Sequence, residues 1–182
     1  MKQGFIVLAF LAAGCGGEAL VSDSRFALGT RISLKVESIA GRDAEKDLGR
    51  LFQEVAKLEK IFDPQRSISL IGNLNKKGFC FFEGPDGALV REVLGRGLDL
   101  ARKTGGAFDP FILPLTQLWG FSSPAPRLQP PSVPEIAAAL QQSGYRKVQL
   151  GTNGMRLPPG AGFDGGGYVK GFVVDRLQSL LL

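Results

Sequence analysis

The sequence predicts an α+β fold, a mixed sheet with packed helices. Segments that alternate apolar and polar residues occur between segments whose apolar residues recur every three or four positions. The expected order is strand, helix, short strand, helix, loop, helix, hairpin, glycine turn and helix, which is too irregular for a doubly wound fold. With 182 residues, 44% of them apolar and 21% charged, the chain has room for one domain with a sizeable core.

The first fifteen residues resemble a bacterial export signal that ends in a lipobox. Lys2 supplies a positive charge, residues 5–11 form an apolar stretch, and small residues lead to Cys15. The stretch is about half as long as the roughly 20 residues that a membrane-spanning helix needs. We therefore expect a lipoprotein signal peptide over 1–15 with lipidation of Cys15, followed by a spacer over 16–25. An ordinary signal peptide or a buried first strand is the alternative.

The folded domain is expected to begin near Arg25 and to occupy residues 26–182. Residues 26–36 alternate apolar and polar side chains, which predicts one half-buried strand. Residues 43–62 place apolar side chains at three- and four-residue steps, which predicts an amphipathic helix that ends before Pro64.

The middle of the chain predicts a loop, a short strand and a second helix. Residues 69–75 are rich in turn-forming side chains, and residues 79–82 form a short apolar run in which Cys80 is expected to be buried. A helical pattern begins at Asp86 and ends before Gly105-Gly106, because glycine commonly ends helices.

The last third of the chain predicts a packed loop, a helix, a hairpin and a final helix. Residues 110–131 are rich in proline and resist regular structure. Residues 134–142 predict a helix with proline in its first turn. Residues 147–157 predict a hairpin around Gly151 to Gly154, and residues 172–182 carry an apolar helical pattern.

Charge and composition exclude several classes of function. The formal net charge is +5, but the basic residues are scattered, so we expect no nucleic-acid partner. The chain contains no histidine, which excludes Ser-His-Asp and Cys-His catalysis and His-ligated zinc. Chemistry is therefore expected from carboxylates, lysine, hydroxyls, backbone groups and bound metal.

Two glycine-rich segments are candidates for ligand binding. In residues 164–171, a glycine triplet lies between a predicted strand and a predicted helix, where backbone N–H groups and Lys170 could approach a phosphate. A strained turn with a solvated lysine is the alternative. In residues 104–110, Asp109 is held before proline and could read a polar ligand, or it could form a structural Asx turn.

Taken together and in order, these segments resemble the ApbE flavin transferases, also called FAD:protein FMN transferases, throughout residues 26–182. The motifs that carry the resemblance are Leu28-Gly29-Thr30, Phe62-Asp63-Pro64, Asn73-Leu74-Asn75, Gly105 to Pro110, Leu118 to Phe121, and Asp164 to Gly171. Leu28 stands where the family usually has methionine.

The resemblance implies a magnesium-dependent enzyme that moves FMN from FAD onto a threonine hydroxyl of a target flavoprotein. It also implies an exported lipoprotein, anchored in the inner membrane and facing the periplasm. The FAD contacts that it implies are Leu28, Phe62, Ala107, Phe108, Asp109, Asp164 and Lys170, and the Gly167 carbonyl matches a position that binds Mg²⁺. It identifies no catalytic residue in this chain.

The resemblance also implies that the chain is the N-terminal portion of the family's domain. The family's later Gly-Gly-Asp segment, its histidine-containing loop and its principal magnesium ligands have no counterpart in the sequence. Two other functions stay open at this point: a lipid-anchored FAD-binding module without turnover, and a non-functional truncated product.

Overall fold

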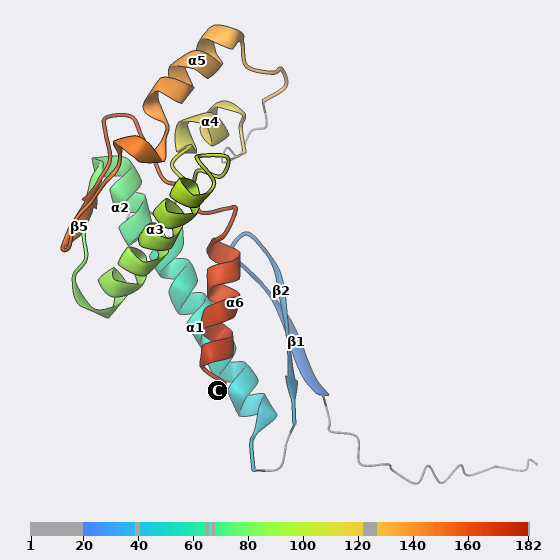
Figure 1. The fold of residues 1–182 in the computed structure, drawn as a ribbon. Helices are drawn as coiled ribbons and strands as arrows, with labels where there is room; N and C mark the ends of the chain where they lie inside the picture. The colour runs from blue at the N-terminus through green and yellow to red at the C-terminus, as the bar shows by residue number, and fades with distance from the viewer. Residues whose placement is uncertain (1–19, 39–40, 65, 67, 122–126, 182) are drawn as a thin grey trace, which may run out of the picture.

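The computed structural model describes residues 20–38, 41–64, 66, 68–121 and 127–181, and it confirms the α+β class. In the described residues, the strands form a two-stranded sheet, β1-β2, and a three-stranded sheet of order β3-β5-β4. Both sheets are antiparallel. Figure 1 shows the β1–β2 hairpin beside α1 and α6, with the second sheet, α2 and α3 next to them and α5 at the far end.

The chain starts with a hairpin of β1 (Leu20–Ala27) and β2 (Thr30–Glu37). Leu28 and Gly29 form its turn with φ values of 51° and 70°, as a two-residue hairpin turn of the I′ type requires. The predicted single strand over 26–36 is therefore wrong, because leucine gives no turn signal. Residues 20–25, which we expected in the spacer, belong to β1.

Helix α1 (Ala44–Phe62) confirms the predicted amphipathic helix and is the central element of the fold. Its Asp43 N-cap accepts a hydrogen bond from the Lys46 N–H, which satisfies one of the free amides at a helix start. Its buried face includes Val55 and Leu58. It contacts both strands of the hairpin as well as α2, α3 and α6.

Helix α2 (Leu70–Lys77) occupies the region where we predicted a loop. The turn-forming residues are its caps: Ser69 Oγ accepts the Gly72 N–H at 2.8 Å, and Gly78 ends the helix with φ 75°. Between the caps, Ile71 and Leu74 are buried at helical spacing. The prediction was wrong because the caps of a short helix resemble the residues of a loop.

The predicted short strand and hairpin are confirmed as one small sheet. β3 (Phe79–Phe81) and β4 (Gln149–Leu150) both pair with β5 (Gly154–Arg156). Cys80 is opposite Met155 and is buried with 6% of its surface exposed, as predicted. Burial also raises the pKa of the Cys80 thiol.

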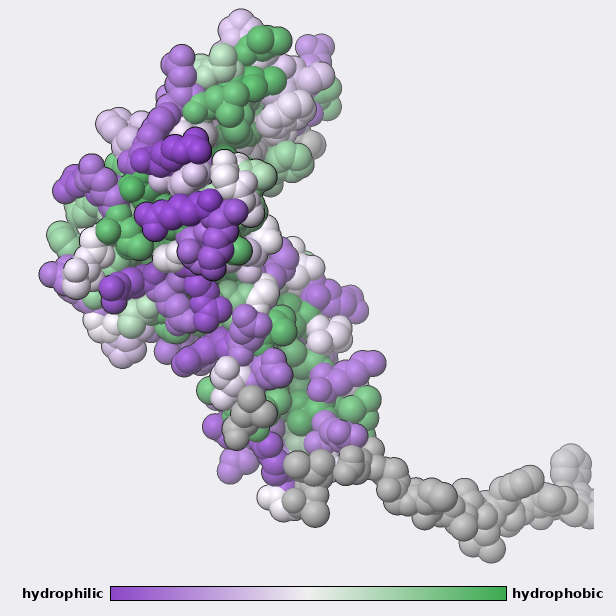
Figure 2. All heavy atoms as spheres, viewed as in Figure 1, coloured by the Kyte–Doolittle hydropathy of each residue, from purple (hydrophilic) through white to green (hydrophobic). Residues whose placement is uncertain are grey.

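The predicted second helix, α3 (Gly84–Lys103), starts two residues before Asp86. Helix α4 (Leu113–Leu118) then lies in the segment that we predicted as a packed loop, and α5 (Val133–Gln142) confirms the next helix. The predicted packing is confirmed at Phe111, which is fully buried, but not at Phe121, which is 81% exposed. Figure 2 shows apolar surface at the α5 end of the molecule.

Helix α6 (Val169–Ser179) begins three residues earlier than predicted. Lys170 and Gly171 therefore lie in its first turn rather than in a loop. Phe172 and Val173 are buried against the core. No helix in the described part of the chain is long and apolar enough to cross a membrane. Cys15 and the predicted signal peptide lie outside the described residues.

Candidate functional site

A cleft of about 360 Å³ opens where the β1–β2 turn, the end of α1 and the start of α6 meet. The lining residues are Leu28, Gly29, Glu59, Phe62, Asp63, Pro64, Asp164, Gly165, Gly166, Val169 and Lys170. Four of the residues predicted to contact FAD are among them: Leu28, Phe62, Asp164 and Lys170. The fold thus brings together residues that are more than a hundred positions apart in the sequence.

The wall of the cleft at Leu28 is held by a carboxylate that the sequence analysis did not single out. Glu59 Oε1 accepts the Leu28 N–H at 2.7 Å and so ties the hairpin turn to α1. The sequence analysis gave Glu59 no role, because its spacing in the helix gives no signal for this contact. Only the packing of the hairpin on the helix shows it.

Phe62 lines the cleft but also belongs to the core. Its ring packs edge-to-face against Phe172 with centroids 5.8 Å apart and planes at 90°, and only 5% of Phe62 is exposed. The contact joins the end of α1 to α6. Stacking of Phe62 on a flavin stays a prediction.

The glycine turn before α6 is ordered by local hydrogen bonds. Asp164 Oδ1 accepts the Gly166 N–H at 2.8 Å, and the Gly165 carbonyl accepts the Val169 N–H at 2.9 Å. A Cβ on Gly165 would lie 2.4 Å from Val169 Cγ2, so the turn requires glycine there. The predicted strand before this turn does not form. The chain from residue 157 to residue 165 is irregular instead.

The start of α6 offers groups that can bind an anion. No side chain caps this helix, and Lys170 in its first turn is exposed. Free amides at a helix start and the helix dipole both favour negative charge. The cleft also carries the carboxylates of Glu59, Asp63 and Asp164, so a phosphate would depend on Lys170, these amides and an accompanying cation.

The second predicted segment, residues 107–109, does not line this cleft. Asp109 accepts the Phe111 N–H and the Tyr145 N–H, both at 2.8 Å, so its carboxylate forms the Asx turn that we considered as an alternative. Phe108 is nearer the glycine turn, because a Cβ on Gly167 would lie 3.1 Å from its ring. Ala107 is exposed beside it.

Tyr168 is a further residue that the sequence analysis did not assign. Its hydroxyl donates to the Val93 carbonyl at 2.7 Å, and its ring packs edge-to-face with Phe108 at 5.7 Å. Burial raises the pKa of Tyr168. Tyr168 therefore holds the glycine turn against α3. In the sequence, only its position between the glycine triplet and Lys170 could have indicated this role.

The described residues contain no group of three or more acidic, histidine or cysteine side chains arranged to hold a metal ion. Magnesium prefers about six oxygen ligands in octahedral geometry. Asp164 already accepts the Gly166 N–H through Oδ1. Magnesium binding by the Gly167 carbonyl therefore stays a prediction.

Comparisons with known proteins agree on one family. The sequence model of the ApbE family matches residues 28–182. The FAD:protein FMN transferase of Treponema pallidum (strain Nichols) is 27% identical in an alignment of length 201, which covers 99% of this chain and 52% of that protein. The chain therefore spans about half the length of this curated relative.

Solved structures agree with this fold. The ApbE protein of Thermotoga maritima MSB8 superposes with a TM-score of 0.80 at 25% identity, covering 88% of this chain and 52% of that protein. The flavin transferase ApbE of Vibrio cholerae has a TM-score of 0.79 at 22% identity, covering 90% and 53% respectively. The α+β fold is therefore shared with these proteins.

Proposed function

Because the chain belongs to the ApbE family, we propose that it acts in protein flavinylation, moving FMN from FAD onto a threonine hydroxyl of a target flavoprotein. The observation that carries the proposal is the cleft in which Leu28, Phe62, Asp164 and Lys170 meet. These are residues that the resemblance assigns to FAD, and they come from three distant parts of the chain. The name of the curated relative supports the same activity.

The side chains of the cleft would divide the work of binding. Lys170 would face a phosphate of FAD with its positive charge, and the dipole of α6 would favour the same phosphate at the start of the helix. Leu28 and Phe62 would contact the flavin with apolar surface. Asp164 would shape the glycine turn through its bond to Gly166.

FAD would also extend beyond the cleft. About 360 Å³ is at the small end for ligand pockets, whereas FAD is a whole dinucleotide. Phe108 packs beside Gly167 and Tyr168, so the segment that holds Ala107, Phe108 and Asp109 adjoins the glycine turn. Asp109 would act there by holding the loop rather than by a free carboxylate.

The described residues do not by themselves form a complete magnesium site. Magnesium dependence therefore rests on the family resemblance, in which the Gly167 carbonyl is one ligand. The roles given to Lys170 and Phe62 do not depend on the metal.

The location of the protein is part of the proposal. Lipidation of Cys15 would anchor the chain at the inner membrane, facing the periplasm, where an acceptor flavoprotein could be reached. Labelling with a radioactive fatty acid tests this: the unchanged chain should take up label and Cys15→Ser should not. Equal labelling of both chains would overturn the lipid anchor.

FAD fluorescence tests the enzymatic function, because cleavage separates the flavin from the adenine that quenches it. Growth of emission with magnesium, together with release of AMP, would support the transferase. Lys170→Ala should weaken FAD binding by about tenfold or more, since a charged hydrogen bond is lost. Lys35→Ala, on the exposed side of β2, is the control and should bind FAD normally.

Other outcomes would decide against transfer. Saturable FAD binding without AMP release would instead support a lipid-anchored FAD-binding module. Aggregation without FAD binding would support a non-functional product. Unchanged FAD affinity in Lys170→Ala would reject the assignment of this cleft.

A further inference from the structure

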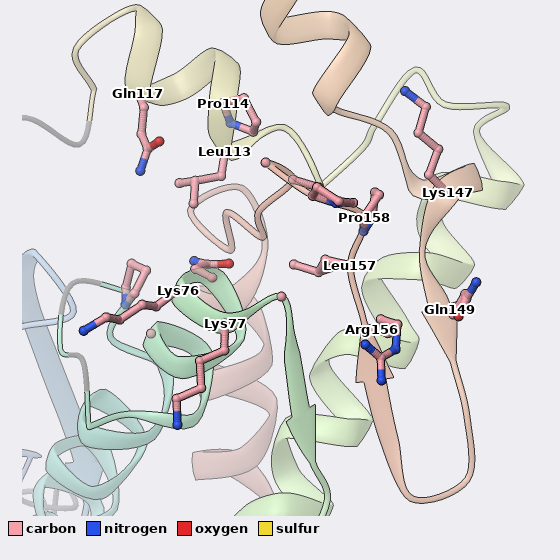
Figure 3. Close-up of a pocket in the computed structure, with 17 residues that line it drawn as sticks. Lys76, Lys77, Leu113, Pro114, Gln117, Lys147, Gln149, Arg156, Leu157 and Pro158 are labelled. Atoms are coloured by element: carbon pink, nitrogen blue, oxygen red, sulfur yellow. The ribbon is translucent and has the colours of Figure 1, made fainter.

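A second and larger cleft, of about 990 Å³, lies beside the first, and Pro64 lines both. Figure 3 shows four cationic residues around it: Lys76, Lys77, Lys147 and Arg156. No aspartate or glutamate is among its described lining residues. We call this surface the basic cleft.

Among the residues that the structure describes, no acid forms an ion pair with the four cations of the basic cleft. The ion pairs of the described residues involve none of them. Lys147 Nζ donates to the Gln141 carbonyl, and Arg156 lies 5.8 Å from the centroid of the Phe79 ring. Such a concentration of unpaired positive charge favours an anionic partner.

The arrangement favours an extended partner over a compact anion. The cations come from α2, from the short 3-10 turn η1 (Tyr145–Lys147) and from β5, and their charged ends point in different directions in Figure 3. A single phosphate is held by donors that converge on it. Pro114 and Pro158, both half-buried, supply apolar surface in the lining of the cleft. An extended polypeptide with several carboxylates matches both features.

We propose that the basic cleft binds an acidic stretch of the acceptor protein, an inference that rests on the proposed function. Asn75 in the lining of this cleft accepts the Phe163 N–H at 2.7 Å and donates to the Phe163 carbonyl at 2.9 Å. Phe163 directly precedes Asp164 of the smaller cleft. A segment held here therefore lies next to the place where flavin is proposed to bind.

The test measures fluorescence anisotropy of a short labelled peptide that alternates aspartate and alanine. The unchanged chain should bind this peptide and should not bind its asparagine counterpart. Lys76→Gln/Lys77→Gln/Lys147→Gln should weaken binding about tenfold, from the loss of three exposed charge pairs. The control Arg31→Gln/Lys35→Gln/Lys46→Gln removes the same charge from exposed sites outside both clefts and should bind nearly as the unchanged chain does.

Three outcomes would overturn the inference. Equal weakening in both triple variants would show only an effect of net charge, and binding of the asparagine peptide would show that carboxylates are not required. Displacement of the acidic peptide by inorganic phosphate at matched ionic strength would show a compact anion site. Circular dichroism checks that the variants fold. FAD affinity of the Lys76/Lys77/Lys147 variant should be unchanged. Failure of the unchanged chain to bind FAD would instead count against the proposed function.

Discussion

Gly165 lies at the tightest point of the turn before α6, because the side chains of Val169 and Phe163 close the space where a Cβ would stand. Gly165→Ala should therefore lower the free energy of unfolding by about 1–3 kcal/mol through overpacking. Gly171→Ala is the matched control within α6, where nothing lies within 4 Å of the added carbon. Alanine there should raise stability by up to about 1 kcal/mol.

Urea denaturation of the two variants checks this prediction. The two substitutions should shift the midpoint in opposite directions, with little change in slope. Equal shifts would mean that the turn can relax around the new methyl group. The glycine turn itself was visible in the sequence, but which glycine is sterically required was not, because that depends on Val169 in the folded chain.

The same limit applies to the carboxylates. Asp109 was correctly recognised as a constrained residue, and the Asx-turn alternative describes its hydrogen bonds. Glu59 was missed, because its partner is an amide 31 positions away. Local patterns identify residues that act on their neighbours in sequence, and they do not identify contacts made by packing.

Helix α5 has a pH-sensitive start. Hydrogen bonds from the Ser132 hydroxyl, the Ser132 N–H and the Arg127 guanidinium lower the pKa of Glu135 from 4.5 to about 2. A lowered pKa means that the ionised group stabilises the fold above the unfolded pKa of 4.5. This contribution should be lost as the pH falls from 4.5 to about 2.

Unfolding of the unchanged chain and of Glu135→Gln, compared across this pH range, measures the effect. The difference in free energy of unfolding should be constant above pH 4.5 and should shrink toward pH 2. If the difference in free energy of unfolding does not change with pH, the Glu135 carboxylate does not keep its hydrogen bonds to Ser132 and Arg127 in solution. Because Glu135 is exposed, salt should reduce the difference.

At the scale of elements, long periodic helices were predicted well and short elements were not. Helices α1 and α3 follow their apolar spacing closely. Helix α2 was missed because it has only eight residues between its two caps. The β1–β2 turn was missed because its first residue is Leu28, which is not a typical turn residue. In both cases burial against α1 decides the conformation, and burial is a property of the assembled fold.

For the molecule as a whole, Cys80 is an internal probe of unfolding. Cys80 lies in β3 and is buried in the core, and this burial raises the pKa of its thiol. In a Cys15→Ser chain Cys80 is the only thiol, since the sequence has two cysteines. Its reaction with a thiol reagent should be at least about a hundredfold slower in the folded chain than in urea. Comparable rates would mean that this sheet opens without global unfolding.

The two clefts, each formed by segments that are far apart in the sequence, were the part of the molecule that the sequence could not predict. The resemblance named residues of the smaller cleft, but neither their common position nor the basic cleft beside it follows from periodicity. Lys76 and Lys147 carry no special signal in the sequence, and they line one cleft only through the packing of α2 and the hairpin that follows η1.

The smaller cleft is lined by residues from three segments, 28–29, 59–64 and 164–170, so it is complete only when all three are in place. Protein synthesis delivers these segments in that order, so a growing chain can form the hairpin and α1 long before the smaller cleft is complete. Closure over so many residues is also slow compared with helix formation. Flavin that binds only the closed arrangement would stabilise it by mass action. Capture of flavin by a ribosome-bound chain would therefore report the arrival of Lys170, the last contributor, and would be silent about every earlier folding event.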